Sequence, residues 1–449
     1  MTDTELDSST DAPAPPWHLA GNFEPITDEL DVDGLEVQGQ LPEGLEGTYV
    51  RNGFNPRTGW SPHWFFGHGM LHAVDLSGGR ARYRNRYVRT PFWDDDGSDR
   101  SVLMQPDRSP ANTSIVRHHG QWLALEEQHQ PYAVDDDLVT VGLQDFGGAV
   151  QGAFTAHPRE CPITGELLAF GYQLVNEPYL TYYRISPQGE VLQAEPIDLP
   201  NPVMMHDWNV TEHNVVFMDL PVRFSLERAM GGDDPFFFDR DAGARLGVMP
   251  RTGTNADVTW HEIDPCYVFH PVSSYEDGDR IILTVCRSEG VMQNGFDDLG
   301  AMAQLWRWTI DRTTGKVHEE QLDDRRSDFP RIDDRRIGQV ARYGYTAELS
   351  WDGPATIGSE LYKYDLTTGA AEVHTTSPRT RLGEAVFAPA GPDAAEDEGW
   401  VLVFAHDEAE DRTELRVIDA QDFSGPPVAR VQLPRRVPYG AHGAWLPAS

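Results

Sequence analysis

The chain contains very little lysine. Of its 36 basic side chains only Lys316 and Lys363 are lysines, and the formal net charge is −36 over 449 residues. A chain this acidic repels phosphate groups, which excludes nucleic-acid binding by charge neutralisation as a function class. For the same reason we expect no more than weak peripheral contact with an anionic membrane surface.

Cysteine and long apolar runs are scarce as well. Cys161, Cys266 and Cys286 are far apart and odd in number, which excludes a disulfide framework and a thiolate metal site and favours a reducing, cytoplasmic location. The chain has no run of 18 apolar residues. Its first sixteen residues, MTDTELDSSTDAPAPP, are acidic and proline-rich, where a signal peptide would be basic and then apolar. We expect residues 1–16 to form a disordered tail and residues 17–449 a single domain.

A recurring turn signal is the main evidence on fold class. Strand-like runs end in Asp or Ser, in most cases with Gly close behind, at intervals of 47 to 78 residues. The seven copies are AVDLSGG at Asp75, AVDDDLVTVG at Asp135, RISPQG at Ser186, EIDP at Asp264, TIDRTTG at Asp311, YDLTTG at Asp365 and VIDAQDFSG at Asp419. Asp or Ser can accept hydrogen bonds from turn amides and Gly can take positive φ, so each copy is expected to join the outer two strands of a four-stranded unit.

Seven such units predict an all-β protein, a seven-bladed β-propeller whose loops form a cap over the axis. The stretch from Gly231 to Arg251 precedes the fourth turn and is expected to be a long loop on one face.

One apolar stretch carries a histidine in its centre. The segment NPVMMHDWNVTEHNVVFMDLP, from Asn201 to Pro221, predicts two short strands around a polar turn, with His206 carried into an apolar interior where it needs a partner. His157, His206 and His442 each follow a turn signal by 20 to 23 residues, where the innermost strand of the next blade is expected. Imidazoles that meet around a propeller axis suit Fe(II), Zn(II) or Cu(II).

Several sequence blocks resemble those of the carotenoid cleavage oxygenases, a family that also contains lignostilbene dioxygenases and retinoid isomerohydrolases. The blocks occur in the family's order over nearly the whole chain. They are LPEGLEGTYVRNGFNP from Leu41, HWFFGHGMLHAV, RYRNRYVRT, FTAHPRECPITGE, VMMHDWNVTE, YVFHPVSSYEDGD, SDFPRIDDR, GEAVFAP, EDEGW and RVPYGAHGAW.

The resemblance implies a metal site with one non-haem Fe(II) per chain and dioxygen as co-substrate. The implied iron ligands are His157, His206, His270 and His442. Thr113 matches a position whose side chain crowds one remaining iron site and leaves the other to dioxygen.

The resemblance also implies three carboxylates that accept the distal N–H of a ligand ring. The implied pairs are Glu127 with His206, Asp328 with His270 and Glu384 with His442. Asp328 stands where the family usually has Glu, so its bond to His270 is expected to be direct after a backbone shift, water-mediated or weak. We assign Asp207 to holding the turn of its own strand.

The remaining histidines are not expected to bind metal. His63, His68 and His72 match a block that lies near the axis without binding iron. The others are expected to face solvent: His118, His119, His129, His213, His261, His318, His374 and His406.

The implied activity is oxidative cleavage of a C=C bond of a hydrophobic alkene into two carbonyl products. Candidates for an aromatic substrate tunnel, although each also suits an ordinary core, are Trp64, Phe65, Phe92, Trp93 and the run from Phe236 to Phe238. Lignostilbene-type members are similar in having Lys directly before the first of the three glutamates. Here that residue is Glu126, which favours a carotenoid or apocarotenoid over a stilbene or phenylpropenoid. A retinoid-type isomerase and a non-catalytic polyene-binding propeller are the alternatives from other classes.

Overall fold

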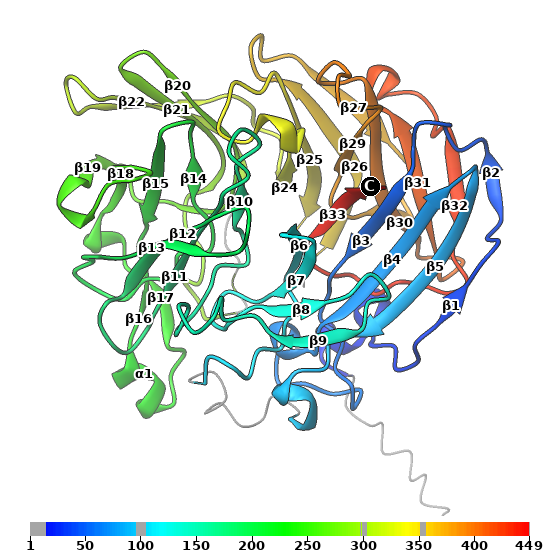
Figure 1. Ribbon diagram of the computed structural model, residues 1–449, viewed down its shortest axis with the longest axis horizontal. Coiled ribbons are helices and arrows are strands. Elements are labelled where there is room, and N and C mark those ends of the chain that lie inside the picture. The colour runs from blue at the N-terminus through cyan, green and yellow to red at the C-terminus, as the bar shows by residue number, and fades with distance from the viewer. Residues whose placement is uncertain (1–14, 96–104, 297, 299–302, 351–355, 449) are drawn as a thin grey trace, which may run out of the picture.

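The computed structural model describes residues 15–95, 105–296, 298, 303–350 and 356–448, and these form seven antiparallel sheets around a central axis (Figure 1). Each sheet is one blade with four strands from the axis to the rim, and two blades carry an extra edge strand. The prediction of an all-β, seven-bladed propeller is confirmed. The cap of loops over the axis stays a prediction, and residues 1–14 of the expected tail lie outside the described residues.

The strands of each blade are given from the axis outward. Blade 1 contains β33 (Gly443–Pro447), β3 (Gly47–Arg51), β4 (Met70–Ser77), β5 (Arg80–Tyr87) and β1 (Asp31–Val32). Blade 2 contains β6 (Ser114–His118), β7 (Gln121–Leu125), β8 (Tyr132–Val134) and β9 (Thr140–Leu143). Blade 3 contains β10 (Arg159–Glu160), β11 (Leu167–Tyr172), β12 (Leu180–Ile185) and β13 (Val191–Ile197). Blade 4 contains β14 (Asn209–Val210), β15 (Asn214–Asp219), β18 (Ala244–Pro250) and β19 (Thr259–Ile263).

The last three blades complete the ring. Blade 5 contains β20 (Tyr267–Asp277), β21 (Arg280–Ser288), β22 (Gln304–Asp311) and β23 (Val317–Gln321). Blade 6 contains β24 (Ser327–Arg331), β25 (Tyr343–Ser350), β26 (Thr356–Asp365) and β27 (Ala371–Thr375). Blade 7 contains β28 (Thr380–Leu382) and β29 (Val386–Pro389), which both pair with β30 (Gly399–Asp407), then β31 (Arg412–Asp419), β32 (Ala429–Gln432) and β2 (Val37–Gly39).

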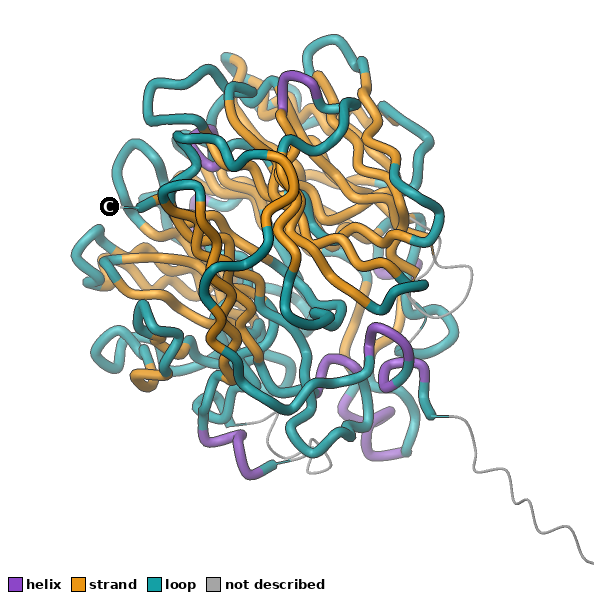
Figure 2. Tube along the Cα trace, turned by 90° about the vertical axis from the view of Figure 1, so that its right-hand side faces the viewer, coloured by secondary structure: helices purple, strands orange, loops and turns teal. Residues whose placement is uncertain are grey.

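Outside the blades lie a small hairpin and short helices, which Figure 2 shows mainly at one end of the molecule. The hairpin consists of β16 (Val222–Phe224) and β17 (Phe236–Phe238), and α1 (Leu226–Gly231) lies between its strands. The 3₁₀ helices are η1 (Trp17–Leu19), η2 (Gly21–Phe23), η3 (Trp64–Phe66), η4 (Pro91–Asp94), η6 (Arg240–Ala242), η7 (Asn255–Asp257), η8 (Asp334–Arg336) and η9 (Ala420–Asp422). Among the described helices, none is long and apolar enough to cross a bilayer.

Six of the seven turn signals close the hairpin between the third and fourth strands of a blade. At Asp311, Oδ1 accepts hydrogen bonds of 2.9 Å from the backbone N–H groups of Thr313 and Thr314. Gly315 follows with φ of +73°, a conformation that residues with a Cβ rarely adopt. The turn at Asp365 repeats these contacts, with 2.9 Å bonds from the next two threonine amides. Local turn chemistry therefore sets where each blade folds back.

The expectation for the fourth turn was wrong. EIDP at Asp264 connects β19 to β20 and so joins blade 4 to blade 5, whereas the outer hairpin of blade 4 lies between β18 and β19. The stretch from Gly231 to Arg251 is not one long loop, because it contains β17, η6 and β18. Gly247 lies inside β18, and a glycine at this position favoured the prediction of a loop over that of a strand. An added Cβ at Gly247 would lie 2.6 Å from the ring of Trp260 on the neighbouring strand. This position needs glycine for close packing and not for a turn.

Five histidines that were predicted to face solvent are buried: His118, His129, His261, His374 and His406. Three of these rings donate to a backbone carbonyl in the outer turn of the next blade. The bonds are His118 Nε2 to Ser186 O (2.9 Å), His261 Nδ1 to Gly315 O (2.9 Å) and His374 Nδ1 to Phe423 O (3.1 Å). The solvent-facing prediction failed for these three histidines because their side chains pack against the next blade. There an imidazole N–H can donate a hydrogen bond to a backbone carbonyl of the outer turn.

The two ends of the chain close the ring together. β33, near the C-terminus, pairs with β3 from Gly47↔Pro447 to Arg51↔Gly443, and Figure 1 shows the two strands side by side. The ring is thus closed by strand pairing within blade 1, which leaves no open interface between the first and last blades.

Trp445 tests this closure. The residue lies in β33, is 9% exposed and packs in the cluster shared by blades 1 and 7. We expect Trp445→Ala to lower the free energy of unfolding by about 3 kcal/mol, the usual cost of truncating a buried aromatic residue. Thermal or urea unfolding measures the change. The control is Trp60→Ala, because Trp60 is 45% exposed; equal losses in both variants would contradict the role of Trp445 in closure.

Candidate metal centre

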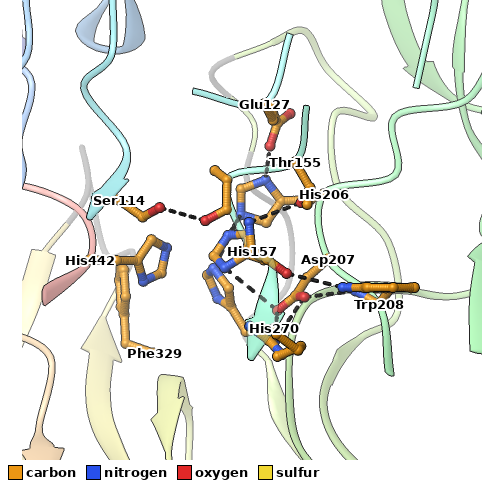
Figure 3. A network of polar contacts seen from close by, with 12 residues as sticks. Ser114, Glu127, Thr155, His157, His206, Asp207, Trp208, His270, Phe329 and His442 are labelled. Carbon is orange, nitrogen blue, oxygen red and sulfur yellow. Dashed lines mark hydrogen bonds and ion pairs between the residues drawn. The ribbon is translucent and has the colours of Figure 1, made fainter. Parts of the chain in front are cut away.

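Four histidines from four different blades converge at the propeller axis (Figure 3). His157, His206 and His442 stand just before β10, β14 and β33, the innermost strands of their blades. His270 lies inside β20, at a point where the pairing register with β21 shifts on both sides of Pro271. This irregularity re-aims the side chain of His270 toward the axis. His270 did not share the spacing of the other three because the turn signal before it, at Asp264, joins blades 4 and 5 and closes no outer hairpin.

The four rings present their nitrogens to one small volume. His206 Nε2 lies 3.1 Å from the Nε2 atoms of both His157 and His270. One nitrogen from each ring, including His442, falls within 4.8 Å of all the others. Separations of this size allow a single ion to be shared by all four rings.

Three of the rings donate from Nδ1 to a buried carboxylate. Glu127 accepts from His206, Asp328 Oδ1 accepts from His270 at 2.8 Å, and Glu384 Oε1 accepts from His442 at 3.0 Å. With the proton held on Nδ1, a neutral ring presents a free lone pair at Nε2. The arrangement therefore fits a metal ion of the kind that imidazole prefers, such as iron, zinc or copper.

Asp328 reaches His270 directly although its side chain is short. The backbone pairing between β24 and β25 is irregular between Asp328 and Arg331, and Phe329 has φ of +52°. The Phe329 amide donates to the same Oδ1 atom at 2.8 Å. A local backbone distortion thus replaces the methylene that glutamate would have supplied.

The other two carboxylates are also held in place. Tyr172 donates its hydroxyl to Glu127 Oε1 at 2.5 Å, and the Gly443 amide donates to Glu384 Oε2 at 2.7 Å. Arg331 Nη1 lies 3.5 Å from the same Glu384 oxygen. These bonds fix the direction from which each carboxylate meets its ring.

Burial sets the protonation of the cluster. Burial and the neighbouring His442 ring hold the pKa of His157 well below its ordinary value. Burial also lowers the pKa of His270, and Asp328 only partly opposes this. Burial acts to raise the pKa of Glu384, but Arg331 and His442 outweigh it and the pKa falls below its usual value. At His206 burial acts to lower the pKa, but Glu127 outweighs it and the pKa rises above its ordinary value. Metal binding requires each ring to give up its proton from the nitrogen that meets the ion.

Acidic and basic side chains both lie around the four rings. Besides the three carboxylates above, Asp207 is 1% exposed and lies 3.7 Å from His157. Arg159 contacts Asp207 at 2.8 Å, and Arg331 lies near Glu384. Burial raises the pKa of Asp207, while Arg159 opposes this shift. Buried charges require such compensation.

Two aromatic residues that the sequence reasoning missed cover the cluster. The Phe329 ring stacks on His270 with centroids 5.4 Å apart and lies 5.2 Å from His442. Phe269 meets His206 edge-on at 5.4 Å. Phe269 directly precedes His270 and Phe329 directly follows Asp328 in the sequence. This adjacency to predicted site residues could have identified both.

Most of the predicted tunnel residues lie in two aromatic groups, since Phe65 joins Trp64 to Phe236 through Phe296. Trp64 and Phe65 pack on Phe54 beside η3. Phe92 and Trp93 pack on His68. Phe236 and Phe65 both contact Phe296 in the β21–β22 connection, at 5.6 and 5.9 Å.

Thr113 lies beside one of the four histidines. Its carbonyl accepts the His442 amide N–H at 3.0 Å, and its hydroxyl donates to Asn112 Oδ1 at 3.0 Å. A cavity of about 20 Å³ lies against Phe329 and Glu384, enough for about one water molecule.

Asp328→Asn tests the role of the carboxylates. The amide keeps the shape but loses the charge that holds the His270 proton on Nδ1, so we expect Co(II) to bind about 10 to 100 times more weakly. Titration followed by the absorption of bound Co(II) measures the loss. Unchanged affinity in a folded variant would show that Asp328 does not support the site.

Comparison with known proteins places the chain among enzymes of one family. The family model described as retinal pigment epithelial membrane protein matches residues 23–447. The chain is 34% identical to the carotenoid cleavage oxygenase of Mycobacterium tuberculosis, over 96% of this chain and 98% of that protein. It is 34% identical to carotenoid 9,10(9',10')-cleavage dioxygenase 1 of Pisum sativum (97% and 91%) and 32% identical to isoeugenol monooxygenase of Pseudomonas putida (95% and 97%).

Solved structures agree with these relatives. The lignostilbene dioxygenase of Pseudomonas brassicacearum superposes with a TM-score of 0.86 at 28% identity, covering 96% of this chain and 98% of that chain. Cobalt-substituted apocarotenoid oxygenase of Synechocystis gives 0.84 at 26% identity, covering 94% and 97%. The sequence resemblance is confirmed: the chain belongs to the carotenoid cleavage oxygenase family and is a dioxygenase of that kind with a four-histidine metal site.

Proposed function

We propose that the protein is a non-haem Fe(II) dioxygenase that cleaves a C=C bond of a carotenoid or apocarotenoid into two carbonyl products. The observation that carries the proposal is the cluster of His157, His206, His270 and His442, three of them donating from Nδ1 to a buried carboxylate. Fe(II) held by these rings would supply open coordination positions at which dioxygen, otherwise slow to react with alkenes, is activated.

The protein's own part in the reaction is positioning. Glu127, Asp328 and Glu384 keep the ligand rings oriented, and Phe269 and Phe329 exclude water from one side of the cluster. Thr113 lies against the backbone of His442, which suits a role in limiting access to one side of the metal.

No side chain at the cluster supplies an activated nucleophile. Cys286 lies next to Asp328, but burial raises the pKa of its thiol well above the ordinary value, and Asp328 adds to the effect. A neutral, buried thiol is a poor nucleophile. The alkene and dioxygen therefore supply every atom that reacts.

The substrate class is inferred from Glu126. Its carboxylate accepts hydrogen bonds from His129 Nδ1 and, at 3.1 Å, from the Gln128 amide. Both bonds hold the carboxylate within its own turn. A carboxylate there repels the phenolate oxygen of a hydroxystilbene, whereas an uncharged polyene meets no such penalty. Identities of 34% to carotenoid-cleaving relatives and 32% to an isoeugenol monooxygenase are too close to decide between the two classes.

A second candidate is cleavage of a neutral phenylpropenoid or stilbene. It is supported by the TM-score of 0.86 with a lignostilbene dioxygenase. A retinoid-type isomerase would use the same rings without consuming dioxygen.

Product analysis under ¹⁸O₂ tests the activity. The Fe(II)-loaded protein is given carotenoids, apocarotenals, isoeugenol and hydroxystilbenes, and we expect two labelled carbonyl fragments from a carotenoid or apocarotenoid. His206→Ala should abolish turnover, while His374→Ala, which removes a buried ring at the rim of blade 6, should keep it. Isomerised product without oxygen uptake, or turnover by His206→Ala, would contradict the proposal.

Exchange of Glu126 tests the substrate class. We expect Glu126→Lys to raise the turnover of a 4-hydroxystilbene relative to a polyene by about tenfold, a change of about 1.4 kcal/mol in discrimination, because an ammonium attracts the phenolate. Glu126→Gln is the control, since it keeps an oxygen acceptor for His129 and removes only the charge. An unchanged ratio of the two turnovers in Glu126→Lys would remove the argument for a polyene.

A further inference from the structure

The fourth ring of the cluster also faces a carboxylate. His157 Nδ1 lies 3.7 Å from Asp207 Oδ2, whereas the Nδ1 atoms of His270 and His442 lie 2.8 and 3.0 Å from their acceptors. Asp207 is 1% exposed and follows His206 directly in the chain. Its carboxylate therefore lies beside the ring of His157, while its backbone directly follows that of His206.

Trp208 ties Asp207 and His157 to each other. The Trp208 amide donates to Asp207 Oδ1 at 2.7 Å, and the indole N–H donates to the His157 carbonyl at 3.0 Å (Figure 3). Trp208 itself is fully buried in the core of the neighbouring blades. These bonds allow little change in the position of the carboxylate relative to the His157 backbone.

Arg159 competes with His157 for this carboxylate. Its Nη2 atom lies 2.8 Å from each oxygen of Asp207, including the Oδ2 that is nearest to His157. A distance of 3.7 Å is too long for a hydrogen bond, so Arg159 now holds the carboxylate that His157 would otherwise engage fully.

We propose that Asp207 is a positioning residue for His157, the fourth carboxylate behind the metal-site rings, and that Arg159 limits how strongly it acts. This inference rests on the metal site of the proposed function. It replaces our assignment of Asp207 to the turn of its own strand alone, since the carboxylate contacts Arg159 and His157 of blade 3 besides the Trp208 amide of its own strand. His157 is then the most loosely supported of the four rings.

Two substitutions separate this role from a structural one, because both break the same ion pair. Asp207→Asn removes the acceptor, and we expect Co(II) to bind about 10 to 100 times more weakly, with a changed absorption spectrum of the bound ion. Arg159→Gln removes the competitor and leaves Asp207 free to engage His157. We expect this variant to bind Co(II) more tightly than the unaltered protein does, even if its thermal stability falls.

Asp219→Asn is the matched control. Asp219 is 2% exposed and is paired with Arg223 at 3.0 Å and Arg245 at 2.7 Å, all within or beside blade 4. Its loss also breaks a buried ion pair, but we expect Co(II) affinity to stay within about twofold, because Asp219 supports no ligand ring.

Equal weakening in Asp207→Asn and Arg159→Gln would overturn the inference, because it would mean that the pair is only structural. Unchanged Co(II) affinity and spectrum in Asp207→Asn would do the same. Should Asp207→Asn fail to fold, Arg159→Gln decides: weaker or unchanged binding refutes the competition, and tighter binding supports it. Failure of the unaltered protein to bind Co(II) would overturn the metal site itself, a result distinct from the other outcomes.

Discussion

The structure depends on keeping four imidazoles together around one small volume at the propeller axis. Nε2 lone pairs 3.1 Å apart repel each other unless a cation lies between them. The protein meets this constraint with carboxylates that accept the Nδ1 protons of three of the rings, and with two arginines that balance part of the acid charge. A metal ion bound by the four rings would remove the remaining repulsion.

The propeller suits this requirement because each blade begins at the axis. A histidine placed just before an innermost strand reaches the axis from any blade, so His157, His206 and His442 come together although they lie far apart in the chain. The blades must also keep their mutual positions. Buried rim histidines that donate to the turn of the next blade, such as His261 to Gly315, help to fix those positions. Closure of the ring by β33 and β3 adds the same restraint at the chain ends.

Aromatic side chains lie against the rings of the cluster. Phe269 and Phe329 contact His206 and His270, while Glu126 directs its carboxylate into its own turn and toward His129. The proposed preference for a polyene rests on the charge of this one side chain and not on the shape of the whole site.

The sequence by itself determined the outer hairpins of six blades, because a turn that relies on Asp or Ser and Gly is encoded within a few residues. The count of seven also included EIDP at Asp264, which joins blade 4 to blade 5. The sequence also singled out the four histidines and three carboxylates, partly by spacing and partly by family resemblance. Only the tertiary structure decided features that depend on neighbouring strands. Gly247 belongs to a strand because Trp260 packs on it, and His118, His261 and His374 are buried because another blade covers them. The direct bond of Asp328 needs a backbone distortion, and the approach of Asp207 to His157 joins two blades. Such contacts link residues that are distant in the chain, and spacing along one strand carries no information about them.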